Sequence, residues 1–412
     1  MPDTFRAPPI LTPEPALAER RGLCTDCGLS RTGMAKACGR ACQFIRPDYP
    51  GSELRIHGRA ATEEGDEAFF GVIRAMHRAR LAPALPGAQW TGITTALAAR
   101  LLETGAVDAV LTVVPDAEDR WKPVPAIITE PEAMAAARGM RMGYAPLLSL
   151  LEPARLAGHR RIAVVGIPCQ VYALRQIEAD LDFEAITVIG TPCSDNTTTE
   201  NFHGFLGRLT DRPETVTYLE FRADYQVELR FEDGSRRDIP FLRLPISDLP
   251  PDFFPLTCRT CVDYTNRLAD VTVGYMGGEG DQWVIARNAR GLELLESLGE
   301  DLVLSEPGSR GRRESSVKGF MENTRLAAGG LPLRRMPDWL RGIMGWLMPR
   351  IGPRGLEFAR ARVEMKAVET VLHLRRAHPR RIKTMVPAHV WHLVGRYGLA
   401  PGAGEARHDD QA

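Results

Sequence analysis

The sequence lacks long apolar runs, and it carries no excess of charge of either sign. No stretch reaches the roughly 18 apolar residues needed to cross a membrane. The N-terminus is interrupted by prolines and lacks the uncharged apolar run of a signal peptide. Lys and Arg together number 52, as do Asp and Glu, so the composition gives no sign of a polyanionic partner. We therefore expect a cytoplasmic protein that binds no nucleic acid.

The sequence also lacks the signatures of several common enzyme classes. It contains no G-x-G-x-x-G fingerprint of a dinucleotide-binding turn and no H-E-x-x-H zinc motif. The nine histidines are scattered and form no Ser-His-Asp arrangement. Only His57, in the string RIHGR, is flanked by glycine and arginine in an expected loop. It is a candidate proton donor, and a merely hydrogen-bonded side chain is the alternative.

The strongest chemical signal is the set of eight cysteines. In a reducing cytoplasm, cysteines bind metals or act in redox chemistry more often than they form disulfides. Four thiolates are what one 4Fe-4S cluster requires, so two sets of four predict a relay of two clusters. The first quartet consists of Cys24, Cys27, Cys38 and Cys42, and the second quartet of Cys169, Cys193, Cys258 and Cys261.

Each quartet has an alternative interpretation. The first has the spacing C-x2-C-x10-C-x3-C, which can also bind zinc tetrahedrally. In the second, Cys169 and Cys193 could instead be small buried hydrophobic residues. Its ligands are dispersed along the chain, which is less like a zinc finger and favours an iron-sulfur cluster.

The hydrophobic pattern predicts an α/β fold with a parallel-sheet core. It predicts helices over 67–80 and 93–103 and a buried strand over 107–114. Two β-branched runs, RIAVVGIPC and EAITVIGTPC, each enter Gly-x-Pro-Cys, with a helix-compatible segment between them. Such a βαβ unit places Cys169 and Cys193 at the same carboxyl edge of the sheet, where ligands of open α/β sheets collect.

The chain divides into three predicted regions. Residues 1–62 show little periodicity and form an N-terminal iron-sulfur segment, organised by its metal centre. Residues 63–305 form the catalytic domain, including an antiparallel meander over 215–246. Residues 306–412 are mostly helical with a polar tail, and their most apolar segment is 339–351. A buried helix is the favoured interpretation of that segment, with contact to a membrane surface or another subunit as the alternative.

Two further features suggest a binding site. The string GAQWTGITT forms a turn that feeds a helix N-terminus, which suits a phosphate or the polar edge of a flavin, although a plain helix start fits as well. Asp195 shares a loop with Cys193 and is a second candidate proton donor, with an Asx-turn as the alternative.

Several strings resemble a known family. CTDCGLS, HGR, GAQWTGITTALAARLLETGAVDAV, GIPCQVYALR, GTPCSDN, CRTCVDYTNRLADVTVGYMG and GPRGLEFAR resemble the beta subunits of the deazaflavin-dependent hydrogenases and dehydrogenases, from about residue 20 to about 390. Within that family they are most similar to the ferredoxin-dependent chlorophyll-pathway branch. This branch contains 3,8-divinyl chlorophyllide 8-vinyl reductase and 7-hydroxymethyl chlorophyll a reductase.

The resemblance implies a set of cofactors and partners. Reduced ferredoxin would donate electrons, two 4Fe-4S clusters would carry them, and FAD would receive them beside an apolar pigment cleft formed partly by the meander. Peripheral contact with the photosynthetic membrane and a homo-oligomer are compatible with this picture. The segment expected to line FAD contains Gly87, Gln89, Trp90, Thr91, Gly92, Thr94 and Thr95.

The first quartet decides which activity ranks first. The plant-type hydroxymethyl reductase pattern is C-x2-C-x2-C with a distant fourth cysteine, whereas this chain has Ser30 in the third place and Cys38 further on. The form CTDCGLS...CGRACQFIRPDYP resembles the bacterial 8-vinyl reductase. Reduction of the 8-vinyl group of divinyl (proto)chlorophyllide to ethyl is therefore ranked first. The alternatives are 7-hydroxymethyl reduction and an electron-transfer beta subunit with the deazaflavin as acceptor.

Overall fold

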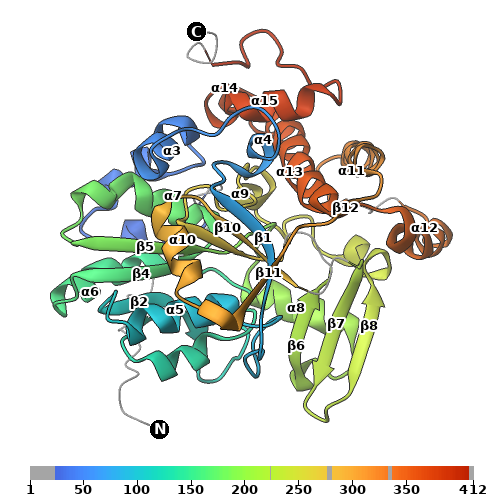
Figure 1. Ribbon diagram of the computed structural model, residues 1–412. Coiled ribbons are helices and arrows are strands. Elements are labelled where there is room, and N and C mark those ends of the chain that lie inside the picture. Colours follow the sequence, from blue (N-terminus) through green and yellow to red (C-terminus); the bar gives the residue numbers. More distant parts are fainter. Residues whose placement is uncertain (1–23, 223, 276–280, 333–335, 408–412) are drawn as a thin grey trace.

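A mixed eight-stranded sheet forms the centre of the computed structural model, which describes residues 24–222, 224–275, 281–332 and 336–407 (Figure 1). Its strand order is β11-β1-β10-β9-β5-β4-β2-β3. The middle strands β9, β5, β4 and β2 are parallel, and the outer pairs are antiparallel, which confirms the predicted parallel-sheet core. The strands are β1 (Ala75–Leu81), β2 (Ala109–Pro115), β3 (Pro123–Ile128), β4 (Arg161–Gly166), β5 (Ala185–Gly190), β9 (Val271–Gly274), β10 (Gln282–Ala286) and β11 (Leu302–Ser305).

Helices cover both faces of this sheet. On β4, Ala163 and Val165 pack with α5 and α10, whereas Ile162 and Val164 point to the opposite face, toward α6 and α7. This alternation arises because successive side chains of a strand point to opposite faces of the sheet. Burial of both faces explains why the strand sequences are continuous apolar runs. The helices are α5 (Ile93–Glu103), α6 (Leu151–Leu156), α7 (Pro168–Ile177) and α10 (Ala289–Glu296).

The repeated Gly-x-Pro-Cys strings form the predicted βαβ unit. Strands β4 and β5 are parallel, with Gly166 opposite Gly190, and α7 connects them. The side chain of Asn266 donates from Nδ2 to the backbone oxygens of Gly166 (2.8 Å) and Thr191 (3.3 Å). A Cβ at Gly190 would lie 2.6 Å from that of Ala269, so only glycine allows this close approach. One side chain thus holds both turns together at the carboxyl edge.

The predicted antiparallel meander is present as a separate three-stranded sheet. It packs its apolar side on α8 and on Phe253, so it has a small core of its own. In Figure 1 it lies beside the main sheet, near α12 (Asp338–Ile351). Its elements are β6 (Val216–Phe221), β7 (Gln226–Phe231) and β8 (Arg236–Pro240), with α8 (Thr199–Leu209) before them.

The N- and C-terminal regions pack on the central domain. The long helix α13 shares one apolar core with Phe70, Trp283 and Ile285, so the C-terminal helices complete the core next to β10. Two short strands, β12 (Ser309–Arg310) and β13 (Arg354–Gly355), pair with each other. The helices are α2 (Cys38–Ala41), α3 (Tyr49–His57), α4 (Glu67–Phe70), α9 (Leu256–Arg259), α11 (Arg313–Ala327), α12 (Asp338–Ile351), α13 (Leu356–Ala377), α14 (Ile382–Met385) and α15 (Ala388–Gly395).

The predicted helix over 67–80 is wrong. Helix α4 ends at Gly71, whose φ of 81° is left-handed, and residues 75–81 form strand β1 instead. β1 pairs with β10 and β11, more than 200 residues away. Pairing with distant strands therefore overrides the local helical pattern.

The favoured interpretation of segment 339–351 as a buried helix is also wrong. The segment is helical, but the exposed fractions are 68% for Trp339, 53% for Ile343 and 60% for Trp346. In the described part of the chain, no helix is both long enough and apolar enough to span a membrane.

A buried ion pair joins α7 to the loop before β9. Arg175 Nη2 and Asp270 Oδ2 are 2.9 Å apart, and each side chain is 1% exposed. Asp270 also accepts hydrogen bonds from the backbone N–H of Val188 (2.7 Å) and from Asn288 Nδ2 (2.7 Å). Burial alone would raise the pKa of Asp270, but Arg175 and these donors outweigh it and hold the pKa below its usual value.

We expect Asp270→Asn to lower the free energy of unfolding by about 3 kcal/mol at neutral pH, because Arg175 loses its buried counter-charge. The folded-state pKa of Asp270 lies below the unfolded value of about 3.9. The stabilisation is therefore complete above that value and is lost as the pH falls through the folded pKa.

Urea unfolding followed by circular dichroism measures the loss. Asp182→Asn, which removes an exposed partner of Arg160, is the control and should leave the midpoint nearly unchanged. Equal midpoints for the two variants would contradict the expectation.

Candidate functional site

A cavity of about 960 Å³ lies at the carboxyl edge of the sheet. Its walls come from the turns after β4 and β5, the meander, and the C-terminal helices α12 and α13. A cavity of this size with a mainly apolar lining and a few converging polar groups is typical of a small-molecule site. Its aromatic lining is Phe44, Trp90, Tyr144, Phe202, Phe205, Phe221, Tyr225, Phe241, Phe253, Phe254, Tyr264, Tyr275, Phe320 and Phe358.

Five of the seven residues expected to contact FAD line this cavity. Trp90 has a left-handed φ of 53°, and its ring stacks on Tyr275 with centroids 4.5 Å apart and planes 7° apart. Thr94 and Thr95 lie in the first turn of α5, where hydroxyl and backbone donors suit a phosphate or the polar edge of a flavin. The five residues are Gln89, Trp90, Gly92, Thr94 and Thr95.

The other two residues build the turn and are not among those that line the cavity. Thr91 Oγ1 accepts a hydrogen bond from the N–H of Leu81 (3.0 Å) and donates to Gln282 Oε1 (3.2 Å). The same Gln282 oxygen accepts from the N–H of Ile93 (3.1 Å), so it caps the start of α5. Gly87 has a φ of 73°, which favours glycine. The segment thus divides into residues that face the cavity and residues that hold its shape.

The structure brings the second quartet together at the cavity wall. Cys169 lies in the first turn of α7, Cys193 in the turn after β5, Cys258 in α9, and Cys261 just beyond α9. Burial raises the pKa of each thiol, and the other three cysteines add to the rise at Cys193. The N–H of Asn196 donates to Cys258 Sγ (3.4 Å), and Gln43 Nε2 donates to Cys261 Sγ (3.6 Å).

The first quartet lies next to the second. Burial raises the pKa of Cys27 to about 12, and the other three members of the first quartet contribute to the rise. Cys27 is also among the neighbours that raise the pKa of Cys169, so these two cysteines, one from each quartet, lie near each other. Helix α2, which begins at Cys38, packs against α7, and the N–H of Leu148 donates to the carbonyl of Cys27 (2.9 Å).

Each quartet has the make-up of a cluster site. Residues 24–407, apart from the short undescribed stretches, contain no group of three His, Cys, Asp or Glu placed to hold one metal ion. A 4Fe-4S cluster instead takes four thiolates, and each quartet supplies four cysteines that affect one another's pKa values. The residues present therefore fit the clusters in number and chemistry, and the clusters stay a prediction.

Asp195 lines the cavity and pairs with a lysine. Its Oδ1 lies 2.9 Å from Lys366 Nζ, which also donates to the carbonyl of Cys258 (2.6 Å) and to Glu369 Oε2 (3.2 Å). Burial raises the pKa of Asp195, while the ammonium group of Lys366 acts in the opposite direction. An aspartate–lysine pair thus lies within the wall that also holds the second quartet.

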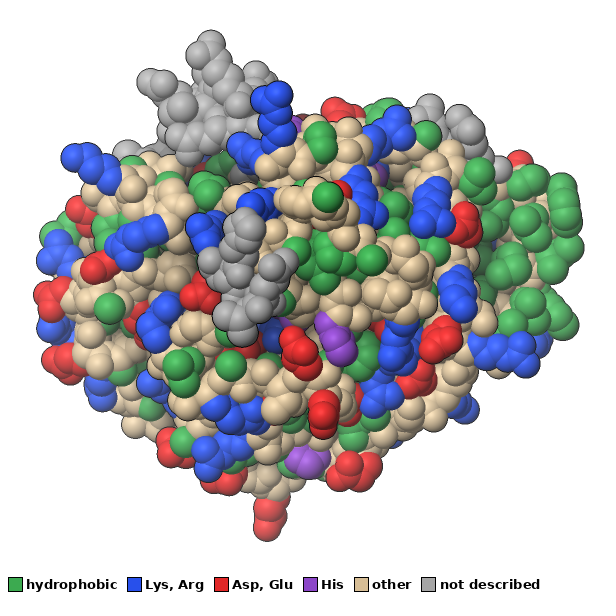
Figure 2. Space-filling model, turned by 90° about the horizontal axis from the view of Figure 1, so that it is seen from above, with side chains coloured by type: hydrophobic (Ala, Val, Ile, Leu, Met, Phe, Trp, Pro, Cys, Tyr) green, Lys and Arg blue, Asp and Glu red, His purple; other side chains and the backbone are tan. Residues whose placement is uncertain are grey.

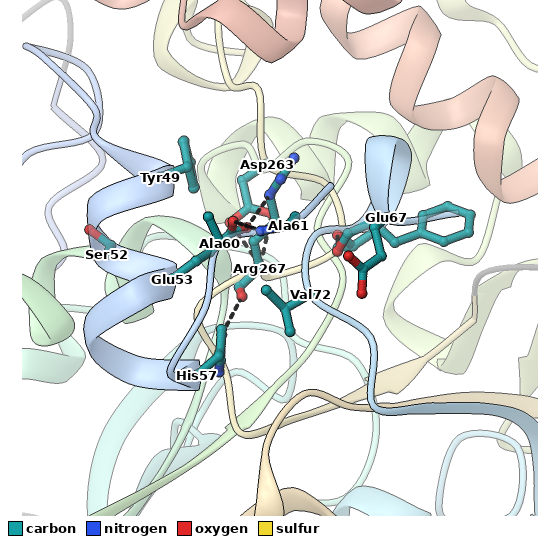
Figure 3. A network of polar contacts seen from close by, with 12 residues as sticks. Tyr49, Ser52, Glu53, His57, Ala60, Ala61, Glu67, Val72, Asp263 and Arg267 are labelled. Atoms are coloured by element: carbon teal, nitrogen blue, oxygen red, sulfur yellow. Dashed lines mark hydrogen bonds and ion pairs between the residues drawn. The ribbon is translucent and has the colours of Figure 1, made fainter. Parts of the chain in front are cut away.

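His57 lies apart from Asp195 and is not among the residues that line the cavity. Its Nε2 donates to the carbonyl of Arg267 (2.9 Å), and its Nδ1 accepts from Asn288 Nδ2 (3.3 Å), so both ring nitrogens are engaged. Burial lowers the pKa of His57 to about 4, so the ring is neutral at pH 7. Figure 3 shows this ring beside the ion pair of Arg267 and Glu53 (2.9 Å). The HGR string thus belongs to a set of hydrogen bonds and ion pairs that connect the N-terminal segment to the loop before β9.

Some residues at the site were not predicted from the sequence. The string VEMKAVET could have pointed to Lys366, because its charged residues occupy the buried side of a helix. Asn266 belongs to the quoted string CVDYTN, but nothing in the string indicates that its amide holds two distant turns. Tyr275 and Gln43 also lie in quoted strings, but nothing in either string indicates the contacts that they make.

Comparison with known proteins identifies the family. Residues 76–152 and 159–307 match the N-terminal and C-terminal parts of the coenzyme F420 hydrogenase/dehydrogenase beta subunit. A 7-hydroxymethyl chlorophyll a reductase from Oryza sativa is 35% identical over 91% of this chain and 82% of its own length. An uncharacterized protein from Nostoc is 37% identical over 92% of this chain and 94% of its own length. The chain belongs to the coenzyme F420 hydrogenase/dehydrogenase beta-subunit family.

A solved structure shares the fold. A chain of the F420-reducing [NiFe] hydrogenase complex from Methanosarcina barkeri superposes with a TM-score of 0.52 at 23% identity, over 58% of this chain and 84% of that one. The two family segments contain the turn expected to line FAD and the second quartet. The first quartet and helices α12 to α15 lie outside them, whereas the Nostoc and rice proteins align over nearly the whole chain.

Replacing a cysteine of the first quartet should remove one cluster. Protein purified without oxygen should contain about eight iron atoms per chain, and Cys38→Ser should reduce this to about four, because one quartet loses a thiolate. Ser30→Ala is the matched control and should keep about eight, since Cys38 takes the third place. Iron analysis and the visible spectrum give the measurement. Full iron in the Cys38→Ser variant together with a loss in Ser30→Ala would reverse the assignment.

Proposed function

We propose that the protein is an oxidoreductase that reduces the 8-vinyl group of 3,8-divinyl (proto)chlorophyllide a to an ethyl group. Reduced ferredoxin is the proposed electron donor. The reaction adds two electrons and two protons to the vinyl carbon–carbon double bond. The family membership and the oxidoreductase relatives support the reaction class.

One observation carries the proposal. The cavity of about 960 Å³ joins the turn expected to line FAD, all four cysteines of the second quartet and the Asp195–Lys366 pair in one apolar enclosure. Electron-carrying groups and a proton source are what a reductase must place against one substrate. The aromatic lining from the meander suits a large, flat, apolar pigment.

The chain's own residues would hold two kinds of cofactor. Gln89, Trp90, Gly92, Thr94 and Thr95 would contact FAD, and the two quartets would hold the 4Fe-4S clusters. When bound, FAD supplies two-electron reduction, and the clusters supply single-electron transfer from the donor. The stacked rings of Trp90 and Tyr275 define a flat wall, and the surrounding apolar side chains exclude water from the enclosure.

A second candidate is reduction of the 7-hydroxymethyl group of chlorophyll a. The rice relative, at 35% identity, carries that name and favours this activity. The arrangement of the first quartet favours 8-vinyl reduction, because Ser30 stands where the hydroxymethyl reductase pattern has its third cysteine. We therefore rank the vinyl group first.

A direct assay decides between the two pigments. Anaerobically purified protein, reduced ferredoxin and either divinyl chlorophyllide or 7-hydroxymethyl chlorophyll a are combined, and the products are separated by chromatography. We expect the ethyl product from the divinyl pigment and no conversion of the hydroxymethyl pigment. The opposite pattern would replace the first candidate with the second, and conversion of neither pigment would overturn both.

Asp195 is the better placed of the two candidate proton donors. Asp195→Asn keeps the side-chain size but removes the acid, so we expect turnover to fall by about 10²–10⁴-fold. Iron and flavin content serve to show that the site is otherwise intact. His57→Gln should retain turnover, because the ring of His57 is engaged outside the cavity. Loss of turnover in His57→Gln at full cofactor content, with Asp195→Asn unaffected, would exchange their roles.

A further inference from the structure

Helix α12 presents an apolar stripe to the solvent. Trp339, Ile343 and Trp346 are spaced i, i+4 and i+7, so they lie on one side of the helix, and each is more than half exposed. Figure 2 shows hydrophobic side chains gathered at the right edge of the molecule, on the side where Figure 1 places α12. Exposed tryptophans side by side are uncommon on a free surface and mark a contact site.

The opposite side of α12 lines the cavity. Met344, Met348 and Ile351 belong to the cavity wall, and Gly345 approaches Pro240 and Leu242 of the meander. Ile351 is also 40% exposed, so this end of the helix reaches both the cavity and the solvent. The helix is therefore a thin apolar partition with the cavity on one side and the outside on the other.

Positive charge gathers around this partition. Among the described residues of the range 306–362 there are ten Lys and Arg but five Asp and Glu, whereas the whole chain is balanced at 52 each, so the excess is local. Arg350 stacks over the ring of Trp346 at 4.2 Å. The N–H of Arg312 donates to the carbonyl of Ile351 (3.3 Å), and Arg310 lies opposite Arg354 in the backbone pairing of β12 with β13, so arginines collect where α12 ends.

We propose that α12 docks the protein on an anionic lipid bilayer, with Trp339, Ile343 and Trp346 inserted at the level of the headgroups. Tryptophan favours the membrane interface because its ring is apolar while its N–H can be hydrated. Neighbouring arginines meet the negative surface potential of anionic lipids. An amphipathic helix that lies in the plane of the interface has this combination of an apolar stripe and basic flanks.

A second copy of the chain fits the stripe less well. Three side chains of about 200 Å² each would bury at most about 600 Å². A stable interface needs roughly 800 Å² from each partner. A bilayer sets no such minimum, and its anionic headgroups complement the local positive charge.

Membrane docking would also bring an apolar substrate close to the cavity, because Ile351 both lines the cavity and is 40% exposed. This step rests on the proposed function, because it takes the substrate to be an apolar pigment. A pigment dissolved in the bilayer would reach the cavity past Met344, Met348 and Ile351 without crossing water. The lipid contact of α12 itself does not depend on which pigment is reduced.

Sedimentation with vesicles tests the docking. The full-length protein with its cofactors is mixed with vesicles of phosphatidylcholine alone or with about one third phosphatidylglycerol, without pigment or electron donor. We expect binding to the anionic vesicles only, and binding that weakens as salt rises. The double variant Trp339→Ala/Trp346→Ala should bind roughly tenfold more weakly. Leu156→Ala, at a 71% exposed leucine of α6, is the matched control and should bind like the unchanged protein.

Three results would overturn the docking: no binding to anionic vesicles, undiminished binding of the double variant, or equal loss in Leu156→Ala. A dimer that the double variant converts to a monomer, measured by light scattering, would assign the stripe to a second copy. Failure of pigment reduction leaves the vesicle result unaffected, so the two proposals fail separately.

Discussion

The buried polar loop 261–270 is the constraint on which the rest of the structure depends. Asp263, Asn266, Arg267 and Asp270 are each at most 5% exposed. Charges in such a place are tolerated only when they are paired. Arg267 pairs with Glu53 of α3, and Asp270 with Arg175 of α7, so the partners come from segments far apart in the sequence. The loop can therefore be buried only when the N-terminal segment and the sheet are already in place.

This pairing also determines where the sulfur atoms of the second quartet lie. The loop begins at Cys261, and Asn266 holds the turns that lead to Cys169 and Cys193. Hydrogen bonds are directional and short, so they fix these turns more tightly than apolar packing could. The carboxyl edge of the sheet is thus preorganised by protein groups, and the same groups connect it to the N-terminal segment that carries the first quartet. The two proposed clusters would have to lie near each other to exchange electrons, and these shared contacts would hold their ligands in place.

Local patterns predicted some elements well and others not at all. The two Gly-x-Pro-Cys strands were predictable because a β-branched run ending in glycine and proline encodes both the strand and its end. Strand β1 was not, because its stability comes from β10 and β11, which no neighbouring residue reveals. The apolar composition of 339–351 predicted a helix but carries no sign of which side faces water. Lys366 is buried by partners that are distant in sequence, and periodicity alone treats such a lysine as exposed.

The two C-terminal walls of the cavity differ in how they are held. Helix α13 is fixed by directional contacts, since Lys366 bonds Asp195, the carbonyl of Cys258 and Glu369 in a buried cluster. Moving α13 would leave those charges unpaired, at a cost of several kcal/mol. Helix α12 meets the cavity through methionine and isoleucine side chains, and apolar contacts of this kind are non-directional. A shift of α12 exchanges one such contact for another, which flexible methionines accommodate readily. The wall that carries charge is therefore held at the cavity by directional contacts, and the wall that carries the exposed tryptophans meets the cavity through non-directional ones.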